Sequence, residues 1–123
     1  MKVQLHGQSV RLRIDESELA QMFEGGRVEN LTQVAGACMR QLVRVGGERP
    51  VLLALADGWC LEIPAGQLVE YAARLPCRDG LAFSFASTQY DATRFVLEVD
   101  VRDSARVRGR RRTSGQAGPV EGT

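Results

Sequence analysis

The sequence predicts an α+β domain in which about eight strands form a mostly antiparallel sheet, open or curled into a barrel, together with two helices. Three observations support this prediction. Short runs of alternating apolar and polar residues recur along the chain, turn signals separate them, and the order hairpin, helix, hairpin occurs twice. Residues 2–45 and 51–101 would then form two ββαββ repeats of the same pattern.

The first half has the signals of a β-hairpin, a helix and a second pair of extended segments. Its extended runs are residues 2–6, 10–14, 27–34 and 38–45. A tight turn at Gly7 and Gln8 joins the first two runs. Asp15 and Glu18 have the three-residue spacing of a helical capping box, and Gly25 ends the helix that they begin.

The second half repeats this order after Pro50. Its extended runs are residues 51–56, 59–63, 81–86 and 94–101. Asp57 and Gly58 are a strong signal for a hairpin turn, because this dipeptide favours the backbone conformation of a two-residue loop. Pro64 then opens a helix, since its fixed φ suits the first turn.

The outer face of the hairpin at residues 51–63 is mostly apolar. Its first strand places Val51, Leu53 and Leu55 on that face. Two interpretations are open. The hairpin is central and is covered on both faces by helices or by a closed barrel, or these three residues form an interface with a second copy or another protein.

The outer face of the first hairpin is the best candidate for ligand recognition. A turn at residues 7–8 places Lys2 opposite Arg13 and Gln4 opposite Arg11, so like charges would lie side by side. One interpretation is an ordinary solvated face that a carboxylate of a neighbouring strand neutralises. The candidates for that carboxylate are Glu62, Glu98 and Asp100. The other is an anion site in which Lys2, Arg11 and Arg13 bind phosphate or carboxylate.

The charge distribution divides the chain of 123 residues into a single domain, residues 1–102, and a tail, residues 103–123. The domain holds 11 basic and 13 acidic residues, whereas the tail holds 5 basic and 2 acidic ones. We expect the tail to be disordered, because it has no aromatic and few apolar residues. It would bind nucleic acid or an acidic partner through its arginines, or serve only to increase solubility. These arginines are Arg106, Arg108, Arg110, Arg111 and Arg112.

No motif in the sequence indicates catalysis or a cofactor. There is one histidine, and neither a nucleophile elbow nor a phosphate-binding loop is present. Cys38, Cys60 and Cys77 form no C-x-x-C pair, so we expect reduced, buried thiols and no metal site. There is also no apolar run of membrane-spanning length and no signal peptide. We therefore expect a cytoplasmic protein that has no membrane contact.

The chain resembles a family of small bacterial proteins of unknown function. The likeness rests on the opening KVQLHGQSVRLRIDESELAQMFEGGRVEN, with its Gly-x-Ser turn, Arg-x-Arg strand and acidic helix start, and on LEIPAGQLVEYAARL further along. It covers residues 2–75. Members of that family end in an acidic segment with a cysteine, whereas this chain ends in arginines. The resemblance implies no activity and no site residues.

Together these observations predict a small cytoplasmic binding or assembly module without enzymatic activity. It would form a homodimer or bind a protein partner through the second hairpin. The alternative is a domain associated with anions or nucleic acid, which would use the face of the first hairpin and the basic tail.

Overall fold

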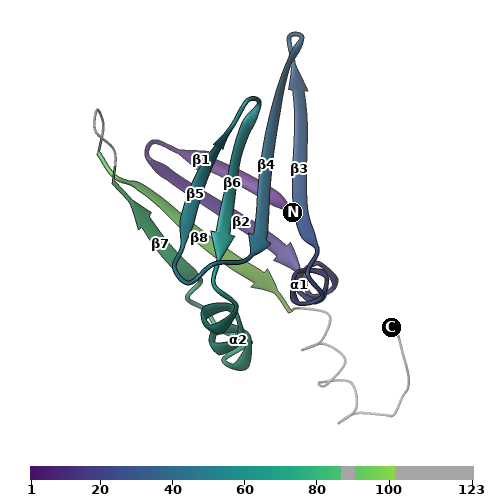
Figure 1. The fold of residues 1–123 in the computed structure, drawn as a ribbon, viewed down its shortest axis with the longest axis vertical. Helices are drawn as coiled ribbons and strands as arrows, with labels where there is room; N and C mark the ends of the chain where they lie inside the picture. Colours follow the sequence, from purple (N-terminus) through teal and green to yellow (C-terminus); the bar gives the residue numbers. More distant parts are fainter. Residues whose placement is uncertain (87–90, 102–123) are drawn as a thin grey trace.

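The computed structural model describes residues 1–86 and 91–101. They form an α+β fold of eight strands and two helices (Figure 1). The elements follow the predicted order, with a hairpin, a helix and a hairpin in each half. Their bounds are β1 Lys2–His6, β2 Ser9–Asp15, α1 Glu16–Phe23, β3 Arg27–Val34, β4 Ala37–Val45, β5 Val51–Leu55, β6 Gly58–Ile63, α2 Ala65–Ala73, β7 Leu81–Phe85 and β8 Thr93–Asp100. The predicted tail, residues 103–123, lies outside the described residues.

The strands form two mixed sheets, which corrects the prediction of one mostly antiparallel sheet. Sheet A has the order β1-β2-β8-β7 and sheet B the order β3-β4-β6-β5. Hairpin partners are antiparallel, but the inner pairs β2–β8 and β4–β6 are parallel. A short turn forces antiparallel pairing only within a hairpin, whereas the inner strands come from different halves of the chain. Among the described strands, neither sheet closes into a barrel.

Each sheet takes one hairpin from each half, so the two halves are interleaved. In sheet A, Leu12 of β2 lies opposite Leu97 of β8, and in sheet B Leu61 of β6 lies opposite Val43 of β4. All four side chains are fully buried in one core between the sheets. The parallel inner pairs therefore join the two halves at the most buried positions of the fold.

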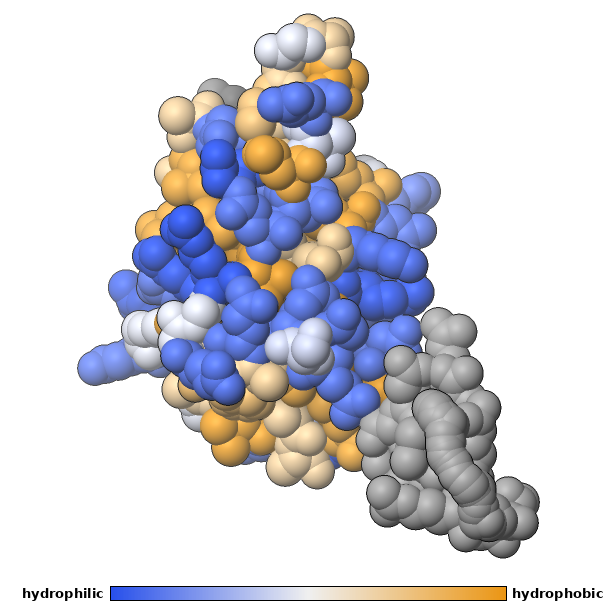
Figure 2. All heavy atoms as spheres, turned by 90° about the vertical axis from the view of Figure 1, so that its right-hand side faces the viewer, coloured by the Kyte–Doolittle hydropathy of each residue, from blue (hydrophilic) through white to orange (hydrophobic). Residues whose placement is uncertain are grey.

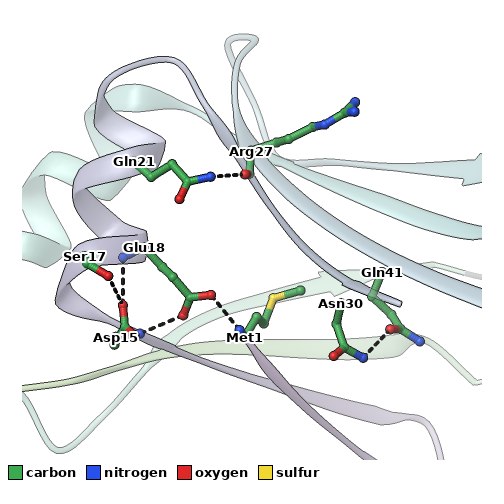
Figure 3. Close-up of polar contacts among 8 residues, drawn as sticks. All are labelled: Met1, Asp15, Ser17, Glu18, Gln21, Arg27, Asn30 and Gln41. Atoms are coloured by element: carbon green, nitrogen blue, oxygen red, sulfur yellow. Dashed lines mark hydrogen bonds and ion pairs between the residues drawn. The ribbon is translucent and has the colours of Figure 1, made fainter. Parts of the chain in front are cut away.

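Helix α1 begins with the predicted capping box. The Asp15 carboxylate accepts a hydrogen bond from the Glu18 backbone N–H at 2.8 Å, and the Glu18 carboxylate accepts one from the Asp15 N–H at 3.0 Å (Figure 3). The other carboxylate oxygen of Glu18 accepts a hydrogen bond from the amino group of Met1 at 2.6 Å. Glu18 thus ties the start of α1 to the start of β1.

Both helices lie at the same end of the two sheets in Figure 1. Their buried residues enter the core between the sheets. These are Leu19 and Met22 of α1 and Leu68 and Tyr71 of α2. The two sheets also meet directly, because the rings of Trp59 and Phe95 pack edge to face with centroids 4.9 Å apart. Neither described helix has the length and apolar character needed to cross a bilayer.

The turn of the β5–β6 hairpin lies one residue earlier than predicted. Leu55 pairs with Gly58, so Ala56 and Asp57 form the loop and Gly58 begins β6. A Cβ atom at Gly58 would lie 1.7 Å from the carbonyl oxygen of Arg40 in β4. Glycine is therefore required at position 58 because β6 packs closely against β4. The residues next to Gly58 in the sequence do not indicate this requirement.

Candidate functional site

The β1–β2 hairpin has the predicted register and presents a cationic outer face. Gly7 and Gln8 form the turn, and Lys2 lies opposite Arg13 while Gln4 lies opposite Arg11. The alternate residues of β2 are buried in the core, so both arginines point outward. The like-charged pair that the sequence predicts is therefore present on the outer face of sheet A.

Glu98 of β8 is the carboxylate that lies against these arginines. Its two oxygens lie 3.4 Å from Arg11 Nε and 3.3 Å from Arg13 Nη2. Of the other two predicted candidates, Glu62 lies on the other sheet, where it pairs with Arg44, and Asp100 lies further along β8, opposite Asp15 of β2. Because Glu98 faces two guanidinium groups, it offsets only one of their charges, and exposed ion pairs of this kind contribute little to stability.

Arg94 adds a further cation that the sequence did not assign to this face. It lies opposite Ser9 in the β2–β8 register and is exposed. Within the described part of the chain, the side chains of Arg94 and Lys2 have no carboxylate partner. The alternation along β8 indicates that Arg94 and Glu98 share a face, but only the pairing of β8 with β2 places them beside the first hairpin.

A shallow hollow of about 520 Å³ lies on this side of sheet A, at the end near the β1–β2 turn. It is lined by Gln4, Leu5, His6, Ser9, Val10, Arg11, Arg94 and Val96. A second hollow of about 240 Å³ lies beside it, and Arg11 contributes to both. The second is lined by Lys2, Val3, Gln4, Arg11 and Arg13. The two hollows bring the predicted cations together with amide, hydroxyl and imidazole groups.

The chemistry of this face is that of recognition by hydrogen-bond donors. Arginine offers several N–H groups in a planar fork that matches the oxygens of phosphate and carboxylate. His6 is exposed beside the turn. Across residues 1–86 and 91–101, no group of three His, Cys, Asp or Glu side chains is placed to hold a metal ion.

The predicted interface residues lie on the outer face of sheet B. Val51 and Leu55 are half-buried, and Leu53 is 36% exposed. The interpretation of a central, doubly covered hairpin is wrong, because β5 is an edge strand of sheet B. The helices send their buried side chains to the other side of the sheet, into the core.

An apolar row crosses the outer face of sheet B. The register places Leu53 of β5 beside Cys60 of β6, and Cys60 beside Leu42 of β4. Leu42 and Cys60 are buried although they point away from the core. Burial raises the pKa of the Cys60 thiol, so this cysteine behaves as a small apolar side chain, as predicted.

Ion pairs flank this apolar row on both sides. Arg44 and Glu62 lie 2.8 Å apart on one side, and Arg40 Nε lies 3.0 Å from Asp57 on the other. Arg40 also contacts Glu29. The hydrogen bond from Arg40 to Asp57 raises the pKa of Arg40, so the guanidinium stays charged. The row is thus an apolar strip with charged borders that ends at the exposed Leu53.

Two other predictions concern the cysteines and the tail. All three cysteines are free, but only Cys60 is buried, whereas Cys38 and Cys77 are half-buried. The prediction of buried thiols is therefore wrong for these two, because Cys77 lies at the margin of the core and Cys38 lies next to the β3–β4 turn, away from the core. The predicted tail site lies outside the described residues. It comprises Arg106, Arg108, Arg110, Arg111 and Arg112.

No protein-family model, curated protein or solved structure matches this chain. The two outer faces described above therefore carry the functional interpretation: a cationic face on sheet A and an apolar row on sheet B.

Proposed function

We propose that this protein is a small, non-enzymatic binding module that recognises an anionic ligand on the outer face of sheet A. One observation carries the proposal. Lys2, Arg11 and Arg13 come from the first hairpin, Arg94 comes from the last, and the β2–β8 pairing gathers them on one face around Glu98. Four cations surround Glu98, so this part of the face has an excess of positive charge, whereas Asp15 and Asp100 lie beyond it, opposite each other in the β2–β8 register.

The ligand class is a phosphate or carboxylate group. The hollows are open and polar, so they suit a small anion or an anionic group displayed on a larger molecule. In such a site Glu98 competes with the ligand for Arg11 and Arg13, whereas Arg94 is available without that competition. Binding should weaken as salt is added, because exposed charges are screened within about 10 Å at 0.1 M ionic strength.

Thermal unfolding with added ligands tests this proposal. Inorganic phosphate, pyrophosphate, a nucleoside triphosphate, citrate and a short single-stranded oligonucleotide are added separately to the full chain. A ligand that binds only the folded state at about a hundred times its Kd adds about 2.7 kcal/mol, so Tm rises. The double variant Arg11→Gln, Arg94→Gln should lose this rise.

A matched control removes the same number of charges elsewhere. The variant Arg27→Gln, Arg49→Gln changes two exposed arginines near sheet B and should keep the rise in Tm. If no anion raises Tm, or if both double variants respond as the unmodified protein does, then the outer face of sheet A is not an anion site.

We also propose self-association as a second function, through the face that carries Val51, Leu53 and Leu55. The apolar row that ends at an exposed edge strand favours it. We further propose that the protein is cytoplasmic and belongs to the small bacterial family that it resembles. We also propose that its tail binds nucleic acid or an acidic partner. The Gly-x-Ser turn and Arg-x-Arg strand of the family likeness are Gly7 to Ser9 and Arg11 to Arg13, which build the cationic face.

A further inference from the structure

The four edge strands differ in how well they are protected against pairing with another strand. Edge strands usually carry charges or other features that prevent such pairing. β1 carries Lys2, and β3 carries Arg27 and Glu29. Figure 2 shows the side of the molecule on which β3 lies, where hydrophilic side chains gather beside apolar ones. β7 has small residues on its outer face, among them Ser84. Neither β5 nor β7 contains a charged residue. Of these two strands, only β5 exposes a leucine, Leu53, on its outer face.

The hydrogen bonds between β6 and β4 show to which side the backbone N–H and C=O groups of each β6 residue point. The carbonyl oxygens of Asp57 and Ile63 accept hydrogen bonds from the N–H groups of Arg40 and Gly46, at 2.7 and 2.9 Å. Backbone polar groups of a strand point to alternate sides along the sheet. The odd-numbered residues of β6 therefore point to β4, and the even-numbered ones point to β5.

The open side of β5 follows in turn. Leu53 lies opposite Cys60, an even-numbered residue of β6, so the odd-numbered residues of β5 bond to β6. The N–H and C=O groups of Leu52 and Ala54 consequently point to the open edge. This edge offers two donors and two acceptors to an incoming strand.

We propose that β5 pairs with β5 of a second copy of this chain, antiparallel and centred on Leu53, so that two sheets B become one eight-stranded sheet. This inference rests on the proposed self-association and specifies its geometry. Leu52 of each copy would lie opposite Ala54 of the other. The two residues would exchange both backbone hydrogen bonds, which gives four bonds across the twofold axis.

The side chains of this arrangement are complementary to themselves. Leu53 would meet Leu53 of the second copy on the twofold axis, and Val51 would face Leu55. The row of Leu53, Cys60 and Leu42 would then continue across the axis into the same row of the second copy. The exposed end of the apolar row would be covered, and no like charges would be opposed.

The residues that flank β5 support a second copy rather than an unrelated strand. In the pairing centred on Leu53, Arg49 of one copy would come near the β5–β6 turn of the other, which holds Asp57, once at each end of the paired strands. Arg49 is exposed and has no ion pair within residues 1–86 and 91–101, while Asp57 is 35% exposed in its side chain. Pro50, which has no N–H, would lie opposite Ala56, where β5 has already ended.

Proline substitutions test the edge directly. Ala54→Pro removes an N–H that points to the open edge and leaves the β5–β6 bonds intact. Gln33→Pro is the matched control on β3, since the two-residue turn at Ala35 and Gly36 directs the Gln33 N–H away from β4. Light scattering across micromolar concentrations should show a dimer for the unmodified chain and for Gln33→Pro, and a monomer for Ala54→Pro.

A charge reversal tests the register without changing the strand. Arg49→Glu places a carboxylate near the turn that holds Asp57 of the second copy, at two symmetric positions, so the dimer Kd should rise about tenfold at low salt. Arg27→Glu reverses a comparable exposed arginine on β3 and should leave the Kd unchanged. An equal change in both variants would mean that Arg49 does not face the interface.

Cysteine cross-linking tests the twofold axis. With Cys38 and Cys77 replaced by serine, and with Cys60, which lies opposite Leu53 within the same chain, replaced by alanine, Leu53→Cys places two thiols on the axis at a separation that a disulfide can span, whereas Leu55→Cys faces Val51. Oxidation should give covalent dimer for Leu53→Cys only. A chain that is monomeric throughout refutes self-association itself. A dimer that survives Ala54→Pro or does not cross-link at Leu53 refutes this pairing while self-association by another surface stands.

Discussion

Asp15 shows how much a single side chain contributes at the start of α1. Its carboxylate accepts hydrogen bonds from the Glu18 N–H and the Ser17 hydroxyl, both at 2.8 Å (Figure 3). The Glu18 backbone bond and then the Ser17 bond hold the pKa of Asp15 below its ordinary value of 3.8. The charged form of Asp15 is thus favoured in the folded state.

Asp15→Ala should lower the free energy of unfolding by about 1 kcal/mol at neutral pH, because α1 loses its N-cap. A lowered pKa stabilises the fold above the unfolded pKa, and this contribution is lost as the pH falls through the folded pKa. The difference between the variant and the unmodified chain should therefore shrink below about pH 3.8. Urea unfolding followed by circular dichroism measures it. Asp79→Ala, at an exposed position, should change little at either pH.

At the scale of elements, the pairing of β6 with β4 depends on Gly58, although nothing within the β5–β6 hairpin requires a glycine at the start of β6. Gly58 lets β6 approach β4 closely, since a Cβ there would overlap the Arg40 carbonyl. Gly66 in α2 is the opposite case, because a Cβ would meet nothing within 4 Å. The same substitution at these two glycines therefore has opposite expected effects.

Gly58→Ala should destabilise the protein by about 3 kcal/mol or more, because β4 and β6 must separate. Gly66→Ala should instead stabilise it by about 0.5 to 1 kcal/mol, because alanine is the better helix former. Chemical denaturation followed by the fluorescence of Trp59 gives both values. Equal effects of the two substitutions would contradict the close approach of β6 to β4.

At the scale of the whole molecule, the interleaved halves make the fold one cooperative unit. The inner strand β2 pairs with β8, and the inner strand β4 pairs with β6. Each half alone would therefore lack one of the two inner strands of each sheet. The core residues that line these inner pairs are fully buried. A half by itself would expose this apolar surface and two unpaired strand edges.

Residues 1–47 and 48–123, prepared as separate chains, should each lack cooperative unfolding. Mixed in equal amounts, they should recover the circular dichroism and Trp59 fluorescence of the intact chain, because the loop between β4 and β5 is the only connection removed. Size-exclusion chromatography of the mixture measures the recovered complex. A half that unfolds cooperatively alone would contradict the interleaved arrangement.

The local structure of this protein can be predicted from its amino-acid sequence. Alternating residues, turn signals and the capping box at Asp15 predict the order of the elements and the register of the first hairpin. They also predict the faces on which Arg11 and Leu53 lie. All of these features depend on residues that are close in the sequence. Which hairpins share a sheet depends instead on contacts between distant parts of the chain. Pairing of strands distant in sequence brought Arg94 and Glu98 to the first hairpin and made β5 an edge strand. Such pairing depends on how the whole core packs, which no local pattern records.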